Sequence, residues 1–379
     1  MDTISTGLGG ALLGRALPRA KAGPVATLVV TTASVVPDAD VFFDFFARDP
    51  LASLTVHRGF THSLLGVAVL APLLALLFWR FTPAWRTGTR DKNYPRLLGL
   101  AALGLLWHLF TDLCTSWGTM VYYPFSRARV VWDLLFIIDF TFTAILLFPH
   151  LLARIYREPT GALRRGVVIW LALAALTAAL VAVGASFLGA PDNWGLLFLL
   201  LALQAALLAA PALHNWGFGW PAALYCRAGL AALAVYLGVC AAAHQAALAR
   251  VKAFSAAEGL AVEAQAALPQ PLSPFRWTGL VLTPTGVRQS WFNVFDNNAL
   301  RFEFYPNAQN SFVQQASALP QVKTFLWFAR FPRITYRREP ARHVVEYTDL
   351  RFHGPNRRNP FVLRVVLDPE GRVIAWGIR

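Results

Sequence analysis

Charged side chains are scarce in this chain of 379 residues: they make up 14% of it, whereas hydrophobic residues make up 56%. Roughly 25% charged is usual for a soluble globular domain, so this composition excludes a disordered chain and argues against a wholly soluble one. Acidic residues are the scarcer sign, with 20 Asp and Glu against 34 Lys and Arg and a net charge of +14. A chain that is both apolar and basic is expected to meet anionic lipids or phosphate-bearing substrates at a membrane. Nucleic-acid binding would leave the apolar excess unexplained, so we expect no nucleic-acid partner.

Cysteine is also nearly absent: Cys114, Cys226 and Cys240 lie among apolar neighbours, and none forms a CxxC pair. This pattern indicates neither a disulfide framework nor a zinc site built from thiolates. The sequence has no serine-hydrolase elbow, no Walker loop and no dinucleotide-binding fingerprint. Any chemistry is therefore expected from histidine, carboxylate and arginine side chains.

Long apolar runs dominate the first 250 residues, and a helix that spans a bilayer needs about 20 such residues. Two shorter apolar stretches, at 4–17 and 24–36, are expected to form a helical hairpin. The fold class predicted from these runs is a mainly α membrane protein built as a multi-helix transmembrane bundle. The six predicted spans are 63–80, 96–114, 133–152, 166–189, 194–213 and 221–248.

The character of the chain changes after residue 250. A proline-containing linker is predicted at 251–270, and after it β-branched and aromatic residues alternate with polar ones between turn-forming residues. This pattern predicts a small β-rich extramembrane domain at 271–379, which is basic and carries over half of the net charge. The remaining chain divides into a helical membrane domain at 1–150 and additional transmembrane helices at 151–250.

Histidine and aspartate occur together near the end of the second predicted span. His108 and Asp112 are four residues apart, so both side chains project from one helical face and can bind one metal or bridge two. The alternative is a helix-end histidine that simply hydrogen-bonds to its neighbour. Ionisable residues near a bilayer boundary are costly and more often functional, which favours a site.

A second pair of histidines, His57 and His62, lies directly before the first predicted span. Gly59 between them permits a bend, and an imidazole in the first turn of a helix is held in the neutral form that binds metal. The alternative is two interfacial histidines, with Arg58 as an anchor for lipid headgroups.

Four aspartates near these histidines have different expected roles. Asp40 would be an oxygen ligand if its loop folds back toward His57, whereas Asp38 follows a proline and is expected to be structural. Asp139 has the most apolar surroundings of any carboxylate in the chain, so it pairs with a cation or metal in the bundle or lies closer to the interface. Asp133 is expected to start a helix.

Together these segments supply five nitrogen and oxygen ligands on one predicted side of the membrane. Mixed His and Asp ligation without thiolates suits zinc, with manganese or iron as alternatives. A metal of this kind activates water and polarises a phosphoryl or carbonyl group. The candidate ligands are Asp40, His57, His62, His108 and Asp112.

Charge in the loops predicts the orientation of the chain. The segments 80–96 and 153–166 are rich in arginine and lie on one side if the six spans are right, so the positive-inside rule makes that side cytoplasmic. The segments 37–62 and 114–132 and the C-terminal domain then lie on the extracytoplasmic side. We therefore predict a multi-pass protein of the inner (plasma) membrane with an extracytoplasmic metal site.

The first 150 residues carry five motifs: PDAD at 37–40, HRGFTHS at 57–63, HLFTD at 108–112, TSWGT at 115–119 and YPFS at 123–126. Together these motifs resemble a known family, the membrane-bound metal-dependent hydrolases of the YdjM/YbcI type, also called DUF457. The resemblance implies an all-α metal core similar to zinc phospholipase C and P1 nuclease, merged with membrane helices, and it implies hydrolysis of a phosphoester. It also implies that the five residues above are metal ligands. One departure is that members of the family often carry a Thr-His pair where this chain reads Ser5-Thr6, so a ligand for an additional metal is missing.

The leading hypothesis is thus a membrane hydrolase that cleaves a phosphoester or ester of a lipid-like or other anionic substrate. Asp40, or a carboxylate outside the ligand set such as Asp139, would be the general base, and Arg58 would hold an anionic group. Arg127 and Arg129 are weaker candidates for anion binding and are better explained as headgroup anchors. The rival hypothesis is a transporter or scaffold in which the His/Asp cluster is an ion relay; a third is a degenerate hydrolase with a structural metal.

Overall fold

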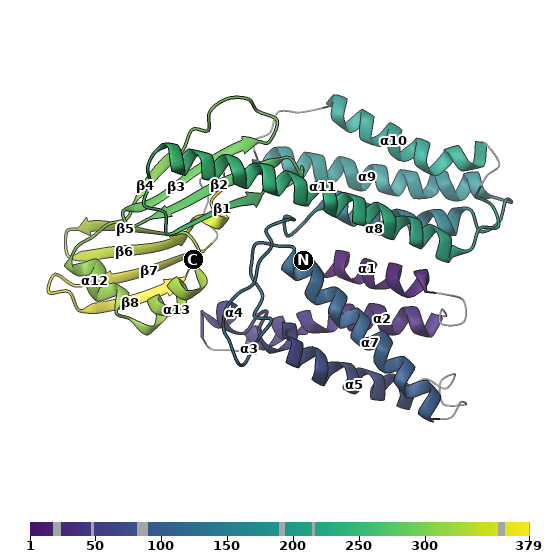
Figure 1. Cartoon of the computed structure of the whole chain (residues 1–379), viewed down its shortest axis with the longest axis horizontal. Coiled ribbons are helices and arrows are strands. Elements are labelled where there is room, and N and C mark those ends of the chain that lie inside the picture. The colour runs from purple at the N-terminus through teal and green to yellow at the C-terminus, as the bar shows by residue number, and fades with distance from the viewer. Residues whose placement is uncertain are drawn as a thin grey trace.

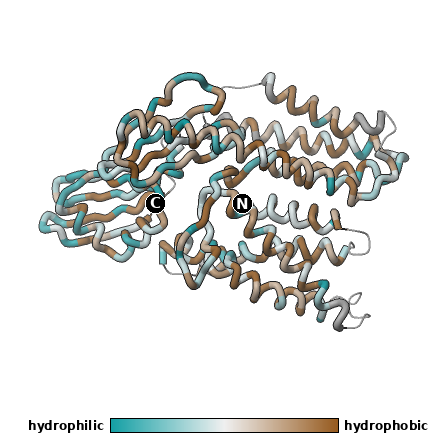
Figure 2. The backbone as a smooth tube through the Cα atoms, viewed as in Figure 1, coloured by the Kyte–Doolittle hydropathy of each residue, from teal (hydrophilic) through white to brown (hydrophobic). Residues whose placement is uncertain are grey.

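A computed structural model describes residues 1–17, 24–46, 49–81, 90–188, 194–213, 217–354 and 361–378. Helices that run side by side form one end of the molecule, and a β-rich domain forms the other (Figure 1). Hydrophobic residues line the helices, whereas hydrophilic residues are more frequent in the β-rich domain (Figure 2).

The predicted hairpin of short helices forms the centre of the bundle. Helix α1 (Thr3–Ala16) starts at Asp2, whose side chain accepts a hydrogen bond from the backbone N–H of Ser5, and helix α2 (Pro24–Val35) returns beside it. Glycines permit this close packing: a Cβ at Gly14 would lie 2.7 Å from the Cα of Thr27, and one at Gly104 of α7 would lie 2.4 Å from the carbonyl oxygen of Val30. Small residues at helix contacts are typical of membrane bundles.

In the part of the chain that the structure describes, four helices are long and apolar enough to cross a membrane: α5 (Leu64–Phe81), α7 (Arg90–Leu113), α9 (Ala162–Leu188) and α11 (Ala222–Ala257). Helices α8 (Phe140–Ile155) and α10 (Trp194–Leu213) contain shorter apolar stretches. Each of the six predicted spans therefore coincides with a helix, although only four reach the length and hydropathy of a span within the described residues.

Helix α8 begins seven residues later than the span predicted at 133–152. Asp139 accepts a hydrogen bond from the backbone N–H of Phe142 and caps the helix, so the residues before it remain non-helical. Thr115 and Leu135 form an isolated parallel β-bridge, which holds the non-helical segment against the end of α7. Asp133, expected to start a helix, lies in this segment with a φ of 53°.

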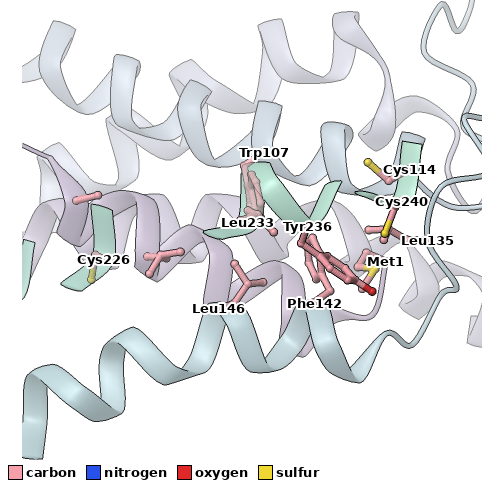
Figure 3. Packing of buried hydrophobic residues seen from close by; sticks show 12 residues of the cluster. Met1, Trp107, Cys114, Leu135, Phe142, Leu146, Cys226, Leu233, Tyr236 and Cys240 are labelled. Carbon is pink, nitrogen blue, oxygen red and sulfur yellow. The ribbon is translucent and has the colours of Figure 1, made fainter. Parts of the chain in front are cut away.

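The packing of α8 and α11 forms a core next to the amino terminus (Figure 3). Phe142 and Leu146 of α8 meet Leu233 and Cys240 of α11 there, and Trp107 of α7 stacks on Phe142 with their ring planes at 8°. Because this core joins helices from both halves of the bundle, it fixes the end of α7 relative to α1.

The segment predicted as a linker at 251–270 is largely regular structure. Helix α11 runs on to Ala257, where Gly259 with a φ of 60° ends it, and strand β1 begins at Ala264. The helix continues because Ala243, Ala247 and Val251 pack against Trp277 and Val281 of the adjoining sheet. Tertiary packing therefore extends the helix past the apolar run.

The C-terminal domain contains two four-stranded antiparallel sheets, each in sequential strand order. The first sheet packs on α11, and the second is covered by two short helices, α12 (Ser311–Ser317) and α13 (Pro320–Phe328). The first sheet comprises β1 (Ala264–Pro269), β2 (Arg276–Thr283), β3 (Gly286–Asn293) and β4 (Glu303–Pro306). The second comprises β5 (Pro332–Glu339), β6 (Arg342–Asp349), β7 (Val362–Leu367) and β8 (Val373–Ile378).

Candidate metal centre

Short elements at the ends of the bundle helices bring the histidines and aspartates together. A 3₁₀ helix, η1 (Val36–Asp40), follows α2 and carries Asp38 and Asp40; a second, η2 (Phe60–His62), precedes α5 and ends at His62. The last turn of α7 supplies His108 and Asp112. Asp38 and Asp112, which are 74 positions apart in the sequence, thus meet because the hairpin and α7 pack side by side.

Four side chains converge on one buried point. The Nε2 atom of His62 lies 3.3 Å from Oδ2 of Asp112 and 3.5 Å from Oδ1 of Asp38. The Nε2 atom of His108 lies 3.5 Å from each of the same two oxygens. A tetrahedral site with metal–ligand distances of about 2.0–2.1 Å places its ligand atoms about 3.3–3.4 Å apart. The four spacings are close to that value, and Asp38, His62 and His108 form one of the two groups of described residues that are close enough to hold a metal ion, with Asp112 beside them.

Three of these four atoms are buried without a hydrogen-bond partner among the described residues: Nε2 of His62, Nε2 of His108 and Oδ2 of Asp112. Unsatisfied buried polar atoms are costly, so three at one point indicate a missing common partner. The other ring nitrogen of His108 lies 2.8 Å from the carbonyl oxygen of Ser34, to which it donates, leaving the Nε2 lone pair for a metal.

Asp40 supports the histidines through hydrogen bonds. Its Oδ1 lies 2.8 Å from Nδ1 of His57, and its Oδ2 accepts from the backbone N–H of Arg58 and the hydroxyl of Thr61 and lies 3.2 Å from Nδ1 of His62. Asp40, His57 and His62 also form a group close enough to hold a metal. The 2.8 Å contact is short for two ligands of one metal and normal for a hydrogen bond, so we interpret Asp40 as the carboxylate that orients both rings.

These contacts change the protonation of the groups outside the membrane-spanning helices. Burial opposes ionisation of Asp40, but hydrogen bonds from His57 and His62 outweigh it and hold the pKa of Asp40 below its usual range. Burial alone would lower the pKa of His62, but the carboxylates of Asp38 and Asp40 and the charge of Asp112 raise it above the usual imidazole value. In the absence of metal, His62 therefore retains its proton to higher pH than an exposed histidine.

Arg58 lies buried behind the four-residue cluster, with a backbone φ of 59°. Its Nη2 lies 3.0 Å from Oδ1 of Asp112, and its Nη1 donates to Thr115 at 2.9 Å. The amine of Met1 pairs with the same oxygen of Asp112. Both groups thus hold the oxygen that faces away from His62 and His108, and they aim the other oxygen at the cluster.

Three other predicted residues lie outside the cluster. Asp139 caps α8 and accepts a hydrogen bond from the hydroxyl of Tyr236, and the two metal-competent groups among the described residues do not include it. Thr6 is buried, and its hydroxyl donates to the carbonyl oxygen of Asp2. Arg129 donates to the carbonyl oxygens of Gly118 and Leu54, so its guanidinium holds loops together.

The C-terminal domain is joined to the loop that follows α7. Arg330 binds Asp133 through two hydrogen bonds of 2.9 and 3.0 Å, and Arg351 donates to the carbonyl oxygens of Ser116 and Trp117. Trp117 packs on aromatic rings of that domain and lies 6.2 Å from the ring of His57. The side chain of His57 is 20% exposed, whereas those of His62 and His108 are fully buried. His57 is therefore the histidine through which the site meets solvent.

Asp38 was not among the ligands predicted from sequence, because an aspartate after a proline usually caps a turn. In the structure Pro37 is the second residue of η1, and one turn of that helix aims Asp38 at the Nε2 atoms of His62 and His108. Asp40 faces instead the Nδ1 atoms of His57 and His62. Thr3 also fixes Asp38, by donating to its Oδ2 at 2.6 Å. The paired spacing of two aspartates in PDAD was the available signal.

These features define a mostly helical membrane protein with a buried His/Asp cluster at one end of its bundle and a two-sheet domain beside it. The model of the YdjM inner membrane protein family matches residues 1–190, half of the chain, and the chain belongs to that family. The match confirms the resemblance found in the motifs and includes every residue of the cluster. Comparison with curated proteins and with solved structures gives no match.

Proposed function

We propose that this protein is a metal-dependent hydrolase of the inner membrane that cleaves a phosphoester or ester of a lipid-like or other anionic substrate. The observation that carries the proposal is the convergence of His62, His108, Asp38 and Asp112 at ligand spacing, where three of the facing atoms lack a hydrogen-bond partner among the described residues. This ligand set revises the one expected from sequence: Asp38 replaces Asp40, and His57 is no longer a ligand.

The chemistry of the donors favours zinc, because two imidazoles and two carboxylates without thiolate suit it, while manganese and iron remain alternatives. A bound metal would supply Lewis-acid activation of water and of the substrate's phosphoryl or carbonyl group. Asp40 holds the rings of His57 and His62 in fixed orientations. Arg58 neutralises Asp112 from behind, and Arg58 and the amine of Met1 together fix its carboxylate.

His57 is the group best placed to move a proton. Asp40 binds its Nδ1, so Nε2 is the nitrogen on the opposite side of a partly exposed ring beside Trp117. An imidazole oriented by a carboxylate in this way is a general base or acid. His57 takes over the role that sequence reasoning had given to Asp40 or Asp139.

The metal site and the C-terminal domain are proposed to lie on the extracytoplasmic side. Arg15, Arg80 and Arg154 occupy the last turns of α1, α5 and α8, at the helix ends opposite the cluster. The positive-inside rule places such ends in the cytoplasm. Anionic lipids are the proposed partners of the basic C-terminal domain.

The test uses purified full-length protein in lipid nanodiscs. We expect about one zinc per chain, release of phosphate-bearing headgroups or acids from candidate lipid esters, and loss of both on adding a chelator. His108→Ala should lose metal and activity, whereas His150→Gln, a control in α8 whose ring pairs with Arg15, should keep both. Equal, negligible metal in all variants would refute the proposal, and full metal with no hydrolysis of any ester would favour a structural metal.

A further inference from the structure

Large apolar side chains are exposed around the metal-site end of the bundle. Phe125, in the loop after α7, and Phe46, in the short helix α3 (Val41–Phe46), are 89% and 80% exposed, the highest values for large apolar residues in the described part of the chain. Phe42 of α3 is 71% exposed, and Tyr122 of the same loop is also exposed. Such side chains are normally covered when they gather in one region.

The start of α5 fixes the level of the membrane at this end. Its 18 residues from Leu64 have a mean hydropathy of 2.1, and at 1.5 Å per residue they are about 27 Å long, close to the thickness of a bilayer's hydrocarbon core. Leu64 therefore lies near the boundary between hydrocarbon and headgroups. The backbone N–H of Leu64 donates to the carbonyl oxygen of Val121 at 2.9 Å, which places the loop with Tyr122 and Phe125 at the same boundary.

Helix α3 is held at a similar level from the other side. It begins directly after Asp40, which accepts hydrogen bonds from the backbone of Arg58 and the hydroxyl of Thr61, three residues before Leu64. Helix α3 is thus tied to the segment that leads into α5, and Figure 1 shows it next to that end of α5.

We propose that α3 and the 122–125 loop form an interfacial membrane anchor, in which Phe42, Phe46 and Phe125 enter the headgroup region of the bilayer that α5 crosses. The occupant is lipid because this surface continues the exposed apolar side of α5, where Leu64, Leu65 and Val69 face outward. Aromatic side chains with polar neighbours are typical of that region.

Charge next to the anchor agrees with a lipid surface. Arg127, two residues after Phe125, is exposed, and its guanidinium lies over the ring of Trp327 at 5.7 Å. An exposed cation two residues along the chain from an inserted aromatic residue suits phosphate-bearing headgroups. The anchor would hold the mouth of the site, next to His57, at the membrane surface.

The anchor is independent of whether the site hydrolyses anything, and its test does not measure activity. Phe42→Cys, Phe46→Cys and Phe125→Cys are each labelled with an environment-sensitive fluorophore in nanodiscs of phosphatidylethanolamine and phosphatidylglycerol. Unsubstituted protein is the blank, because its three cysteines are buried. The matched control is Ile374→Cys on β8, a 60% exposed apolar residue of the C-terminal domain.

We expect the emission of the three anchor labels to shift to the blue and to be quenched at least twofold more by lipids spin-labelled near the headgroup than by aqueous iodide. The label at residue 374 should show no blue shift and should be quenched more by iodide than by the spin-labelled lipids. Iodide quenching of the anchor labels equal to that at 374 would overturn the proposal. Labels shielded from both quenchers would also overturn it, since a protein partner or a second copy would then cover the surface.

Discussion

His62 and Asp112 approach each other to 3.3 Å between Nε2 and Oδ2, and neither atom has a hydrogen-bond partner among the described residues. The opposite atom of each group is satisfied: Nδ1 of His62 by Asp40 and Thr61, and Oδ1 of Asp112 by Arg58 and the amine of Met1. A side chain that is held on one side and unsatisfied on the other is oriented toward a ligand.

Asp38 should be as necessary for metal binding as His108. Asp38→Ala removes one of four ligands and should lower metal affinity at least 100-fold, measured by competition with a chromogenic chelator. Asp49→Ala, an exposed aspartate that caps a turn at Leu51, is the control and should bind metal normally. Unchanged affinity of the Asp38 variant would show that this carboxylate is only a structural cap, as the sequence first suggested.

Asp40→Asn should keep the metal but bind it more weakly. Loss of a carboxylate that orients ligating histidines typically costs about 10–100-fold in affinity or activity. Because Asp40 also holds His57, hydrolysis should fall further than metal occupancy does. If metal is lost as completely as in His108→Ala, Asp40 is itself a ligand and the assignment of the two aspartates must be exchanged.

Metal affinity should fall with decreasing pH from above the usual imidazole range. A proton on His62 competes with the metal, and the raised pKa of His62 extends this competition to higher pH. Below that pKa each unit of pH should cost up to about tenfold in affinity for one displaced proton. In metal-free protein, the stability of the fold depends on pH in the opposite direction. Charged His62 stabilises the fold below the unfolded pKa near 6.5, and this stabilisation is lost as pH rises through the folded pKa of His62. Calorimetric titrations in several buffers would show the released proton, and a pH-independent affinity would contradict the site.

Two glycines of α7 should respond in opposite ways to the same substitution. Gly104→Ala forces a Cβ to 2.4 Å from the carbonyl oxygen of Val30, so it should destabilise the protein by about 1–3 kcal/mol. Gly99→Ala meets open space and should be neutral or stabilising by up to about 1 kcal/mol, because alanine favours helix. Thermal unfolding in one detergent compares the two, and equal effects would show that the hairpin does not pack this tightly on α7.

Arg330 and Asp133 should be coupled in a double-mutant cycle. Their bidentate pair links the C-terminal domain to the loop behind the metal site, and Asp133 is buried. Residues in such contact typically show coupling of about 0.5–3 kcal/mol. Thermal unfolding of Arg330→Ala, Asp133→Ala and the double variant measures the coupling, with Arg157→Ala, an exposed residue of the opposite end, as the control. Additive effects would mean that the domain docks without this pair.

Much of the architecture could be predicted from apolar runs. The runs before residue 250 located the helices because a bilayer leaves few alternatives to a continuous apolar helix. The predicted start of α8 was too early. The residues before Asp139 are apolar but form a non-helical loop, and the helix begins only after Asp139 caps it. The predicted linker was replaced by the end of α11 and strand β1, because burial against the first sheet extends the helix.

The sequence by itself determined that histidine and aspartate gather at one end of an apolar bundle, because residue type and spacing along a helix are local properties. Only the tertiary structure decided which of them face one another. Asp38 and Asp40 are two residues apart. The turn of η1 places Asp38 at the Nε2 atoms of His62 and His108, and Asp40 at the Nδ1 atoms of His57 and His62. The role of Arg58 as the partner of Asp112 was decided in the same way. A buried charge pairs with the nearest opposite charge, and the packing of the whole bundle sets the distance between the two side chains.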